Sequence, residues 1–408
     1  MFTPTVITLA IAMFSATLGV GIVAPVLPVR AEELGASGAQ VGLTFSAFAI
    51  TQLFVSPFTG RIADRYGRKQ FILLGVATYV IAALGWRETG SIEVVIALRA
   101  LTGIGSGLVF SLVLSYIGDL APPGQEGRYM GVFGVFEFLG FGLGPVISGV
   151  IRDLAGFDAV FLAMAGMLTT SGLVILVFLP WTCVTKDSPP GEASAGPAQL
   201  VSWGRVRGDP ILPALFAQRV GFSFAFGSAF SFLAIYLEDE IGATATMVGF
   251  VLAGQELLGG ALQPAFGPIA DRYNRRLLVT IGGVVVAAGY VTLALTTEYL
   301  LILAAFVGGA GLGTALMGVS SMAIQVDVGR RLGMATTMSL ASTGFAAGVL
   351  IGSLAAGLIA DSAGTEYVFL TAAGAVLLGT VVFLVRTIQP VPTLTASEDA
   401  HEVTAAGP

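Results

Sequence analysis

Long apolar runs, separated by short polar connections, make up most of the chain. They lie near residues 4–29, 39–59, 70–86, 92–117, 129–150, 159–181, 211–236, 245–266, 277–296, 299–325, 333–359 and 367–386. A helix needs about 20 mostly apolar residues to cross a membrane. The pattern therefore predicts an all-α membrane protein with twelve transmembrane helices. The first run has no basic leading segment and exceeds the ~7–15 apolar residues of a signal peptide, so we interpret it as a span.

Composition indicates a chain that is almost wholly embedded in a membrane. Of its 408 residues, 55% are hydrophobic and 11% are charged, whereas soluble domains are about 25% charged. The net charge of −6 argues against a nucleic-acid partner. Cys183 and His401 are the single residues of their types, which excludes an intrachain disulfide and a histidine metal site inside the membrane. We expect no cofactor, no metal and no enzyme activity.

Two segments interrupt the apolar pattern. Residues 182–209 are rich in Pro, Gly, Ser and Ala, a composition typical of a linker, here on the cytoplasmic side. Residues 388–408 have the composition of a disordered cytoplasmic tail. We therefore expect one six-helix bundle at 1–181 and a second at 210–387.

The distribution of basic residues predicts the orientation. If the N-terminus is cytoplasmic, most of the 19 Lys and Arg residues lie in cytoplasmic loops or helix ends, and the outer loops hold only Arg30, Arg87 and Arg152. Cytoplasmic loops of membrane proteins carry the excess of Lys and Arg. Both termini are therefore expected on the cytoplasmic side of the cell (inner) membrane.

The two expected bundles repeat each other. GRIADRYGRK at 60–69 matches GPIADRYNRR at 267–276 in seven of ten positions, 207 residues later. Farther along, Asp153 corresponds to Asp361 at an offset of 208. Because six spans return the chain to the same side, the repeats run parallel, as in transporters that rock two bundles around a central site.

Three motifs resemble the major facilitator superfamily, and the resemblance to this superfamily extends over the whole chain. The stretch 60–69 is similar to the signature loop between that superfamily's second and third spans. Arg99, Thr102 and Gly103 are similar to its R-x-x-Q-G pattern, with Thr102 in place of Gln. The fifth run resembles the pattern G-x8-G-x3-GP-x2-GG of the twelve-span drug:proton antiporters, with Ser148 in place of one glycine, at Gly131, Gly140, Gly144, Pro145 and Gly149.

The resemblance implies a major facilitator fold, in which two pseudo-symmetric six-helix bundles surround a central cavity. It also implies alternating access driven by protons, a small-molecule substrate, and function as a monomer in the lipid bilayer. Members with the fifth-span motif are mostly exporters. By the same resemblance, spans 1, 4, 7 and 10 line the cavity, and spans 2, 5, 8 and 11 meet between the bundles.

The signature loop is a candidate conformational latch on the cytoplasmic side. Asp64 can face the positive N-terminus of the run that opens near Gly333, and the basic residues can pair with Asp119 or Glu126. A topology signal with a tight glycine turn is the alternative interpretation. The residues assigned to the latch are Gly60, Asp64, Arg65, Gly67, Arg68, Lys69 and Asp119 and, in the second copy, Asp271, Arg272, Arg275 and Asp327.

The glycines and the proline of the fifth run predict a smooth, kinked helix face. Small residues let helix backbones approach closely, so the face serves either a conformational role or plain packing. The eleventh run repeats the glycines without the proline, at Gly344, Gly348, Gly352 and Gly357.

Four charged residues lie well inside the runs, where each costs at least about 2.5–3.5 kcal/mol. They are Arg99, Glu137, Arg219 and Glu256, and their depths suggest one Arg–Glu pair in each bundle. Structural ion pairs are one interpretation. Removal from water favours the neutral form of a carboxyl group, however, whereas a nearby arginine favours its charged form. Either glutamate could therefore carry the coupled proton, with Arg99 modulating the pKa of that glutamate. Gln255, beside Glu256, is a candidate substrate contact.

Three functions remain open at this point. The leading one is proton-coupled export of lipophilic or amphipathic small molecules. The second is a carrier of organic anions that clamps its substrate with Arg99 and Arg219, and an arginine pointing unpaired into the cavity would favour it. The third, a non-transporting membrane sensor, would have only small soluble regions with which to signal.

Overall fold

The computed structural model of the protein describes residues 3–120, 126–181, 209, 211–332 and 334–388, and within these ranges it contains helices and no strand. The expected all-α architecture is therefore confirmed. The helices are α1 (Pro4–Glu33), α2 (Gly38–Tyr66), α3 (Arg68–Glu88), α4 (Ile92–Leu120), α5 (Glu126–Phe178), α7 (Ile211–Asp239), α8 (Ala245–Arg272), α9 (Arg275–Leu295), α10 (Tyr299–Ile302), the π-helix η1 (Leu303–Ala310), α11 (Gly311–Leu332), α12 (Met334–Ala363) and α13 (Thr365–Ile388).

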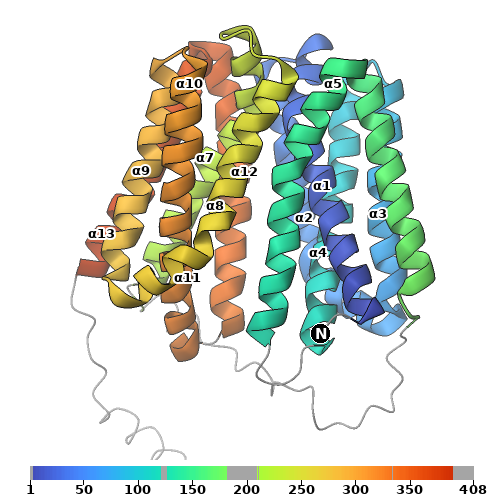
Figure 1. Ribbon diagram of the computed structural model, residues 1–408, viewed down its shortest axis with the longest axis horizontal. Helices are drawn as coiled ribbons and strands as arrows, with labels where there is room; N and C mark the ends of the chain where they lie inside the picture. The colour runs from blue at the N-terminus through green and yellow to red at the C-terminus, as the bar shows by residue number, and fades with distance from the viewer. Residues whose placement is uncertain (1–2, 121–125, 182–208, 210, 333, 389–408) are drawn as a thin grey trace, which may run out of the picture.

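Eleven segments of the described chain are long and apolar enough to cross a membrane, against the twelve runs expected. The longest, Phe133–Phe178, has 46 residues, which at 1.5 Å per residue is about 69 Å, more than twice the ~30 Å hydrocarbon core of a bilayer. Gly156 interrupts α5 with φ 79° and ψ −177°, a conformation that favours glycine. Figure 1 shows α5 as two rods that meet near its label. The lower count therefore arises in α5, which joins the runs 129–150 and 159–181.

We call the end at which α1 begins the basal end, and the opposite end, which holds Gly156, the apical end (Figure 1). At the apical end, α2 and α8 start at hydroxyl N-caps. Ser37 accepts a bond from the Gln40 N–H, and the Gln40 side chain accepts one from the Ser37 N–H. Thr244, 207 positions after Ser37, accepts from the N–H of Met247. Such caps fix where a helix begins.

Helices α1–α5 pack mainly on one another, and so do α7–α13. We call these two sets the N-terminal and the C-terminal helices, and Figure 1 shows them on opposite sides of the molecule. Within the sets, α1 packs along α5, α2 along α4, and α7 along α12 and α13. Two helix pairs provide most of the contact between the sets, α5 with α8 and α2 with α12.

Glycines on α5 let α1 come into backbone contact with it. A Cβ built on Gly144 would lie 2.6 Å from the carbonyl carbon of Gly21 in α1, and one on Gly140 would overlap the Thr17 hydroxyl. Farther along the same helix, Gly149 lies against Ala245 of α8. The fifth-run motif thus serves two different helix contacts, while the surroundings of Gly131 lie outside the described side chains.

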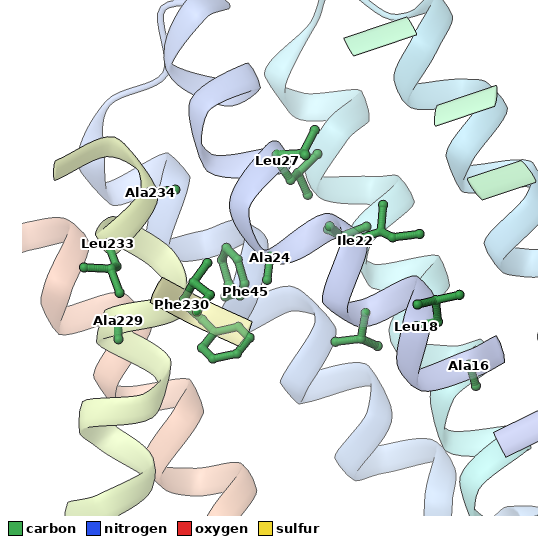
Figure 2. Close-up of a cluster of buried hydrophobic side chains, with 14 of the residues drawn as sticks. Ala16, Leu18, Ile22, Ala24, Leu27, Phe45, Ala229, Phe230, Leu233 and Ala234 are labelled. Carbon is green, nitrogen blue, oxygen red and sulfur yellow. The ribbon is translucent and has the colours of Figure 1, made fainter. Parts of the chain in front are cut away.

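A buried apolar cluster joins the two sets near the apical end. It contains Ala24 of α1, Phe45 of α2 and Phe230 of α7, each at most 5% exposed, and Figure 2 shows these side chains. Ala24 and Phe230 each lie nine residues before the apical ends of their helices, about 13 Å from that end. Side chains from both sets therefore fill the apical part of the molecule.

The close approach of α1 to α5 predicts the effect of one added methyl group. Gly144→Ala would press that group against Gly21, and overpacking of this kind costs about 1–3 kcal/mol. We expect the melting temperature of the purified protein in detergent to fall by a few degrees. Gly134→Ala is the matched control, because a Cβ at that position of α5 meets open space. Equal melting temperatures for the two variants would contradict the close approach.

Candidate functional site

Three charged side chains, contributed by both helix sets, lie within electrostatic range of one another where α5, α7 and α8 join. Glu137 is on α5, Arg219 on α7 and Glu256 on α8. Glu137 interacts with Arg219 and with Glu256. All three residues are partly buried, so their charges are screened less than at a surface.

Close packing of α5 on α8 brings the two carboxyl groups to the same junction. Phe138, which follows Glu137, packs on Gly260 of α8, where a Cβ would lie 2.9 Å from its ring. Leu257, which follows Glu256, occupies the space beside Gly142 of α5. Each helix thus supplies a glycine that receives a large side chain of the other.

Arg219 lies between two equivalent positions of the repeat. Its guanidinium lies 4.8 Å from the centre of the Phe345 ring on α12, and Phe345 stands 208 residues after Glu137. Arg219 Nε is buried without a hydrogen-bond partner among the described residues. Phe345 was not singled out from the sequence as a site residue. Its alignment with Glu137 in the repeat is the signal that could have found it.

Arg99 has a different environment from the one expected. Its side chain is 1% exposed, and its guanidinium lies 4.4 Å from the ring centre of Phe48 and 5.1 Å from that of Phe45, both on α2. Its Nε and Nη1 are buried without a hydrogen-bond partner in the described chain. Cation–π contact with the two rings replaces the carboxylate partner.

The expectation of one Arg–Glu pair in each bundle is therefore wrong. Glu137 interacts with Arg219 of the other helix set, and Arg99 has no carboxylate partner among the described residues. The reason lies in the packing of α5, which lies mainly against α1, α3 and α8 and has little contact with α4. Depth along a helix can be counted from the sequence, but the direction in which a side chain faces depends on packing.

The remaining residues singled out on α7 and α8 are packed in the interior. Gln255 is 5% exposed, and its backbone lies against Gly311 of α11; its role as a substrate contact stays a prediction. Phe226 stacks on Phe230 with ring centres 4.2 Å apart and lies 5.6 Å from Phe345. Phe226 therefore packs against α12, the helix whose Phe345 also lies beside Arg219.

At the basal end, Lys69 caps a helix, and the pairing expected with Asp119 or Glu126 lies outside the described side chains. Its Nζ donates to the carbonyl oxygen of Leu176 at 2.7 Å and lies 4.3 Å from the centre of the Trp181 ring. The last carbonyls of a helix have no partner within the helix and attract cations. Arg276, 207 residues after Lys69, donates in the same way to the carbonyl oxygen of Thr387 at the end of α13.

The second copy of the loop forms a charged network within the C-terminal helices. Arg275 donates to Asp327 at 2.7 Å, to Asp271 at 3.2 Å and to the carbonyl oxygen of Ala270 at 3.0 Å. Arg272 is exposed nearby. The network borders a basal pocket of about 320 Å³ that Tyr273 also lines.

In the first copy, only part of the expected latch is described. The guanidinium of Arg68 lies 5.6 Å from the ring centre of Tyr116 on α4, and Gly67 turns the chain between α2 and α3 with φ 95°. The contacts of Lys69 and Arg275 with described residues thus stay within one helix set. The surroundings of Gly60, Asp64, Arg65 and Asp119 lie outside the described side chains, as does Gly333.

Comparison with known proteins identifies the family. The family model of the Major Facilitator Superfamily matches residues 9–238 and 215–406, and the chain belongs to this superfamily of membrane transporters. An uncharacterised MFS-type transporter of Methanocaldococcus jannaschii is 28% identical over 87% of this chain and 90% of its own length.

Two relatives carry names that refer to drugs. The quinolone resistance protein NorA of Staphylococcus aureus is 27% identical over 62% of this chain and 64% of its own length. Multidrug resistance protein 1 of Bacillus subtilis is 28% identical over 64% of this chain and 65% of its own length. Both alignments span less than two thirds of the relative's length.

Solved structures share the fold at low identity. The nucleoside transporter NupG (D323A mutant) superposes with a TM-score of 0.76 at 13% identity, covering 94% of this chain and 99% of that one. The human organic anion transporter MFSD10 superposes with a TM-score of 0.63 at 18% identity, covering 93% of this chain and 99% of that one. These similarities establish the architecture alone.

Capping by Lys69 predicts a stability effect. Lys69→Met keeps the packing on Trp181 but removes the donor to the Leu176 carbonyl, and we expect a loss of about 1–2 kcal/mol, seen as a lower melting temperature in detergent. Lys69→Arg keeps a donor and should recover most of the loss. Arg87→Met, at an exposed ion pair with Glu88, serves as control. A melting temperature of Lys69→Met equal to that of the control would show that the contact contributes nothing.

Proposed function

We propose that the protein is a secondary active transporter that exports lipophilic or amphipathic small molecules in exchange for protons. The observation that carries the proposal is the electrostatic interaction between Glu137 of the N-terminal helices and Arg219 of the C-terminal helices. It is supported by membership of a transporter superfamily and by relatives named for quinolone and multidrug resistance.

The proposed topology has twelve spans in two six-helix bundles, 1–181 and 210–387, joined by a linker at 182–209. In it α5 crosses twice, turning at Gly156, and α10, η1 and α11 form one crossing, as their joint span Tyr299–Gly329 suggests. Contacts that recur 207 or 208 residues apart support pseudo-symmetry. The basal end is proposed to be cytoplasmic because the basic loops lie there, with the protein in the cell membrane and active as a monomer.

Rocking of the two helix sets would couple protonation to movement. Glu137 interacts with two residues of the C-terminal helices, the cation Arg219 and a second carboxyl, Glu256. When the sets move apart at this junction, Glu137 loses the arginine that favours its charged form and takes up a proton. The return movement restores the arginine and releases the proton. A carboxyl buried within one bundle would lack this dependence on conformation.

The surroundings of the charges fit an apolar or cationic cargo. Phe345 lies beside Arg219, Phe226 packs on Phe345, and Phe230 stacks on Phe226. Aromatic rings of this kind bind flat apolar molecules and organic cations. Arg219 is offset by Glu137, so it offers little net positive charge to an anion.

A carrier of organic anions is the second candidate, and Arg99 favours it. This guanidinium has no carboxylate partner among the described residues, which is the feature that an anion site would use. Its 1% exposure keeps it away from any cargo in this conformation, so an anion would need the other state to reach it.

Purified protein in liposomes, with an imposed proton gradient and an internal pH-sensitive dye, tests both candidates. Lipophilic cations, neutral drugs and organic anions are added in turn. Dissipation of the gradient by the first two classes is the expected result. Dissipation by anions alone would favour the second candidate, and the absence of any response would contradict proton-coupled transport.

Replacing the proposed proton carrier should abolish coupling. In Glu137→Gln the amide has no titratable proton, and we expect cargo-dependent proton flux to fall to the level of protein-free liposomes while cargo still binds. Glu298→Gln, at an exposed apical carboxyl, should leave the flux unchanged. Undiminished flux in both Glu137→Gln and Glu256→Gln would overturn the assignment.

Arg99→Met separates the two cargo classes. The methionine side chain can still pack on Phe45 and Phe48, but it carries no charge. We expect flux with lipophilic cations to persist in Arg99→Met. An anion carrier would instead lose its flux in this variant and keep part of it in Arg99→Lys, which retains the charge.

A further inference from the structure

An aspartate at the apical end of α12 binds the first turn of α2 across the boundary between the helix sets. Asp361 Oδ1 accepts a hydrogen bond from the Gly38 N–H at 2.6 Å, and Oδ2 accepts one from the Ala39 N–H at 2.9 Å. The first N–H groups of a helix have no partner within it, and the helix dipole favours a negative charge there. Asp361 thus acts as a cap supplied by the opposite helix set.

The same arrangement occurs a second time, with the roles of the two sets exchanged. Asp153 of α5 accepts hydrogen bonds from the N–H groups of Ala245 at 3.1 Å and Thr246 at 2.8 Å, at the start of α8. Asp361 follows Asp153 by 208 residues, and Ala245 follows Gly38 by 207. The two contacts are therefore equivalent positions of the repeat, placed on either side of the molecule's centre.

Small residues bring the helices together below the Asp361 contact. A Cβ built on Gly357 of α12 would overlap the carbonyl oxygen of Gly38, and one built on Gly42 of α2 would overlap that of Ser353. Ser46 and Ser353 share a hydrogen bond of 2.8 Å, with both hydroxyls buried. Backbone contact of this kind is possible only while the apical ends of α2 and α12 stay together.

The Asp153 contact has a matching seam. A Cβ built on Gly149 of α5 would overlap the carbonyl oxygen of Ala245, and one built on Gly249 of α8 would overlap that of Pro145. The proline and last glycine of the fifth-run motif thus lie directly at the boundary between the helix sets. Gly149 is about one helical turn from Asp153 and Pro145 about two.

One side of the molecule has an additional ion pair. Arg152 forms a bidentate pair with Glu238 of α7, with Nη2 2.7 Å from Oε2, and the two side chains are 15% and 16% exposed. The equivalent positions on the other side are Ala360 and Ala31, which cannot form such a pair. The α5–α8 side therefore has an ion pair that the α2–α12 side lacks, whereas the α2–α12 side has the hydrogen bond between Ser46 and Ser353.

We propose that Asp153 and Asp361 form an apical lock, a pair of equivalent carboxylate-to-helix contacts that holds the apical end closed and must break for that end to open. Each contact joins one helix set to the other, so neither survives separation of the sets there. The apolar cluster around Phe45 and Phe230 lies beneath the lock and closes with it. The proposal concerns only the equilibrium between two conformations, and it holds whatever the cargo or coupling ion.

Distance measurement between spin labels tests the lock without cargo. Gly90 and Thr297 are exposed apical residues, one in each helix set and 207 positions apart. Labels are attached to Gly90→Cys and Thr297→Cys in a Cys183→Ser background of the full chain in lipid nanodiscs. Opening of the apical end lengthens the distance between them, and the areas of the two populations give their ratio.

We expect Asp361→Ala to raise the ratio of apical-open to apical-closed molecules about fivefold, as loss of a charge at a helix N-terminus implies. Asp153→Ala should have a smaller effect because the Arg152–Glu238 pair remains, and the double variant a larger one than either. Asp361→Asn, which keeps the shape and loses the charge, covers the case in which the alanine variant folds poorly. Asp158→Ala removes an exposed apical carboxylate that has no described contact with the C-terminal helices, and it should leave the distances unchanged.

A wedge at the seam tests the same state without touching a charge. Gly357→Val would place a side chain against the Gly38 carbonyl of the opposite set, so it should also increase the open population. Gly166→Val, where a Cβ meets open space, is its control. Unchanged distances in both aspartate variants and in the wedge variant would overturn the proposal, and this outcome would leave the test of proton-coupled export unaffected.

Discussion

Backbone contact between α5 and α8 is the constraint on which the rest of the structure depends. In a bilayer the lipid tails are as apolar as leucine, so helices associate through close packing and polar contacts. Gly142, Gly149, Gly249 and Gly260 allow this packing, because a larger residue at any of them would meet the opposite helix. Glu137 and Glu256 come within range of one another only because these glycines let the two helices touch.

Several charged residues lie at the boundary between the helix sets, so the strength of their interactions depends on how the two sets are placed. A buried charge that always keeps its partner contributes little beyond stability, whereas one whose partner belongs to the other set changes its environment with each conformation. Glu137 and Arg219 are of the second kind, and so are Asp153 and Asp361 with the helix N-termini they bind. By contrast, Lys69 and Arg275 have their described partners within a single set, so these contacts stabilise each set by itself.

The sequence was sufficient to predict the helices but not the direction in which their side chains face. Apolar run length located nearly every helix, because spanning a bilayer imposes that length on any sequence. The family motifs likewise led to the superfamily that the comparisons identify. The partner of Glu137 could not be predicted, since it depends on how α5 rotates against α1 and α8. The hydrogen bond from Lys69 to the Leu176 carbonyl could not be predicted either, because every residue has a backbone carbonyl and the sequence does not distinguish this one. Asp153 and Asp361 were visible as a repeated pair, but their partners are backbone N–H groups.

Arg219 interacts with both Glu137 and Phe345, which are matching positions of the two repeats with different chemistry. Identical halves would carry the same side chain at both positions, so any carboxyl at this junction would occur twice. Divergence of the repeats leaves a carboxyl at one position and an aromatic ring at the other. The charge distribution at the junction is therefore asymmetric, although the sequence around it repeats.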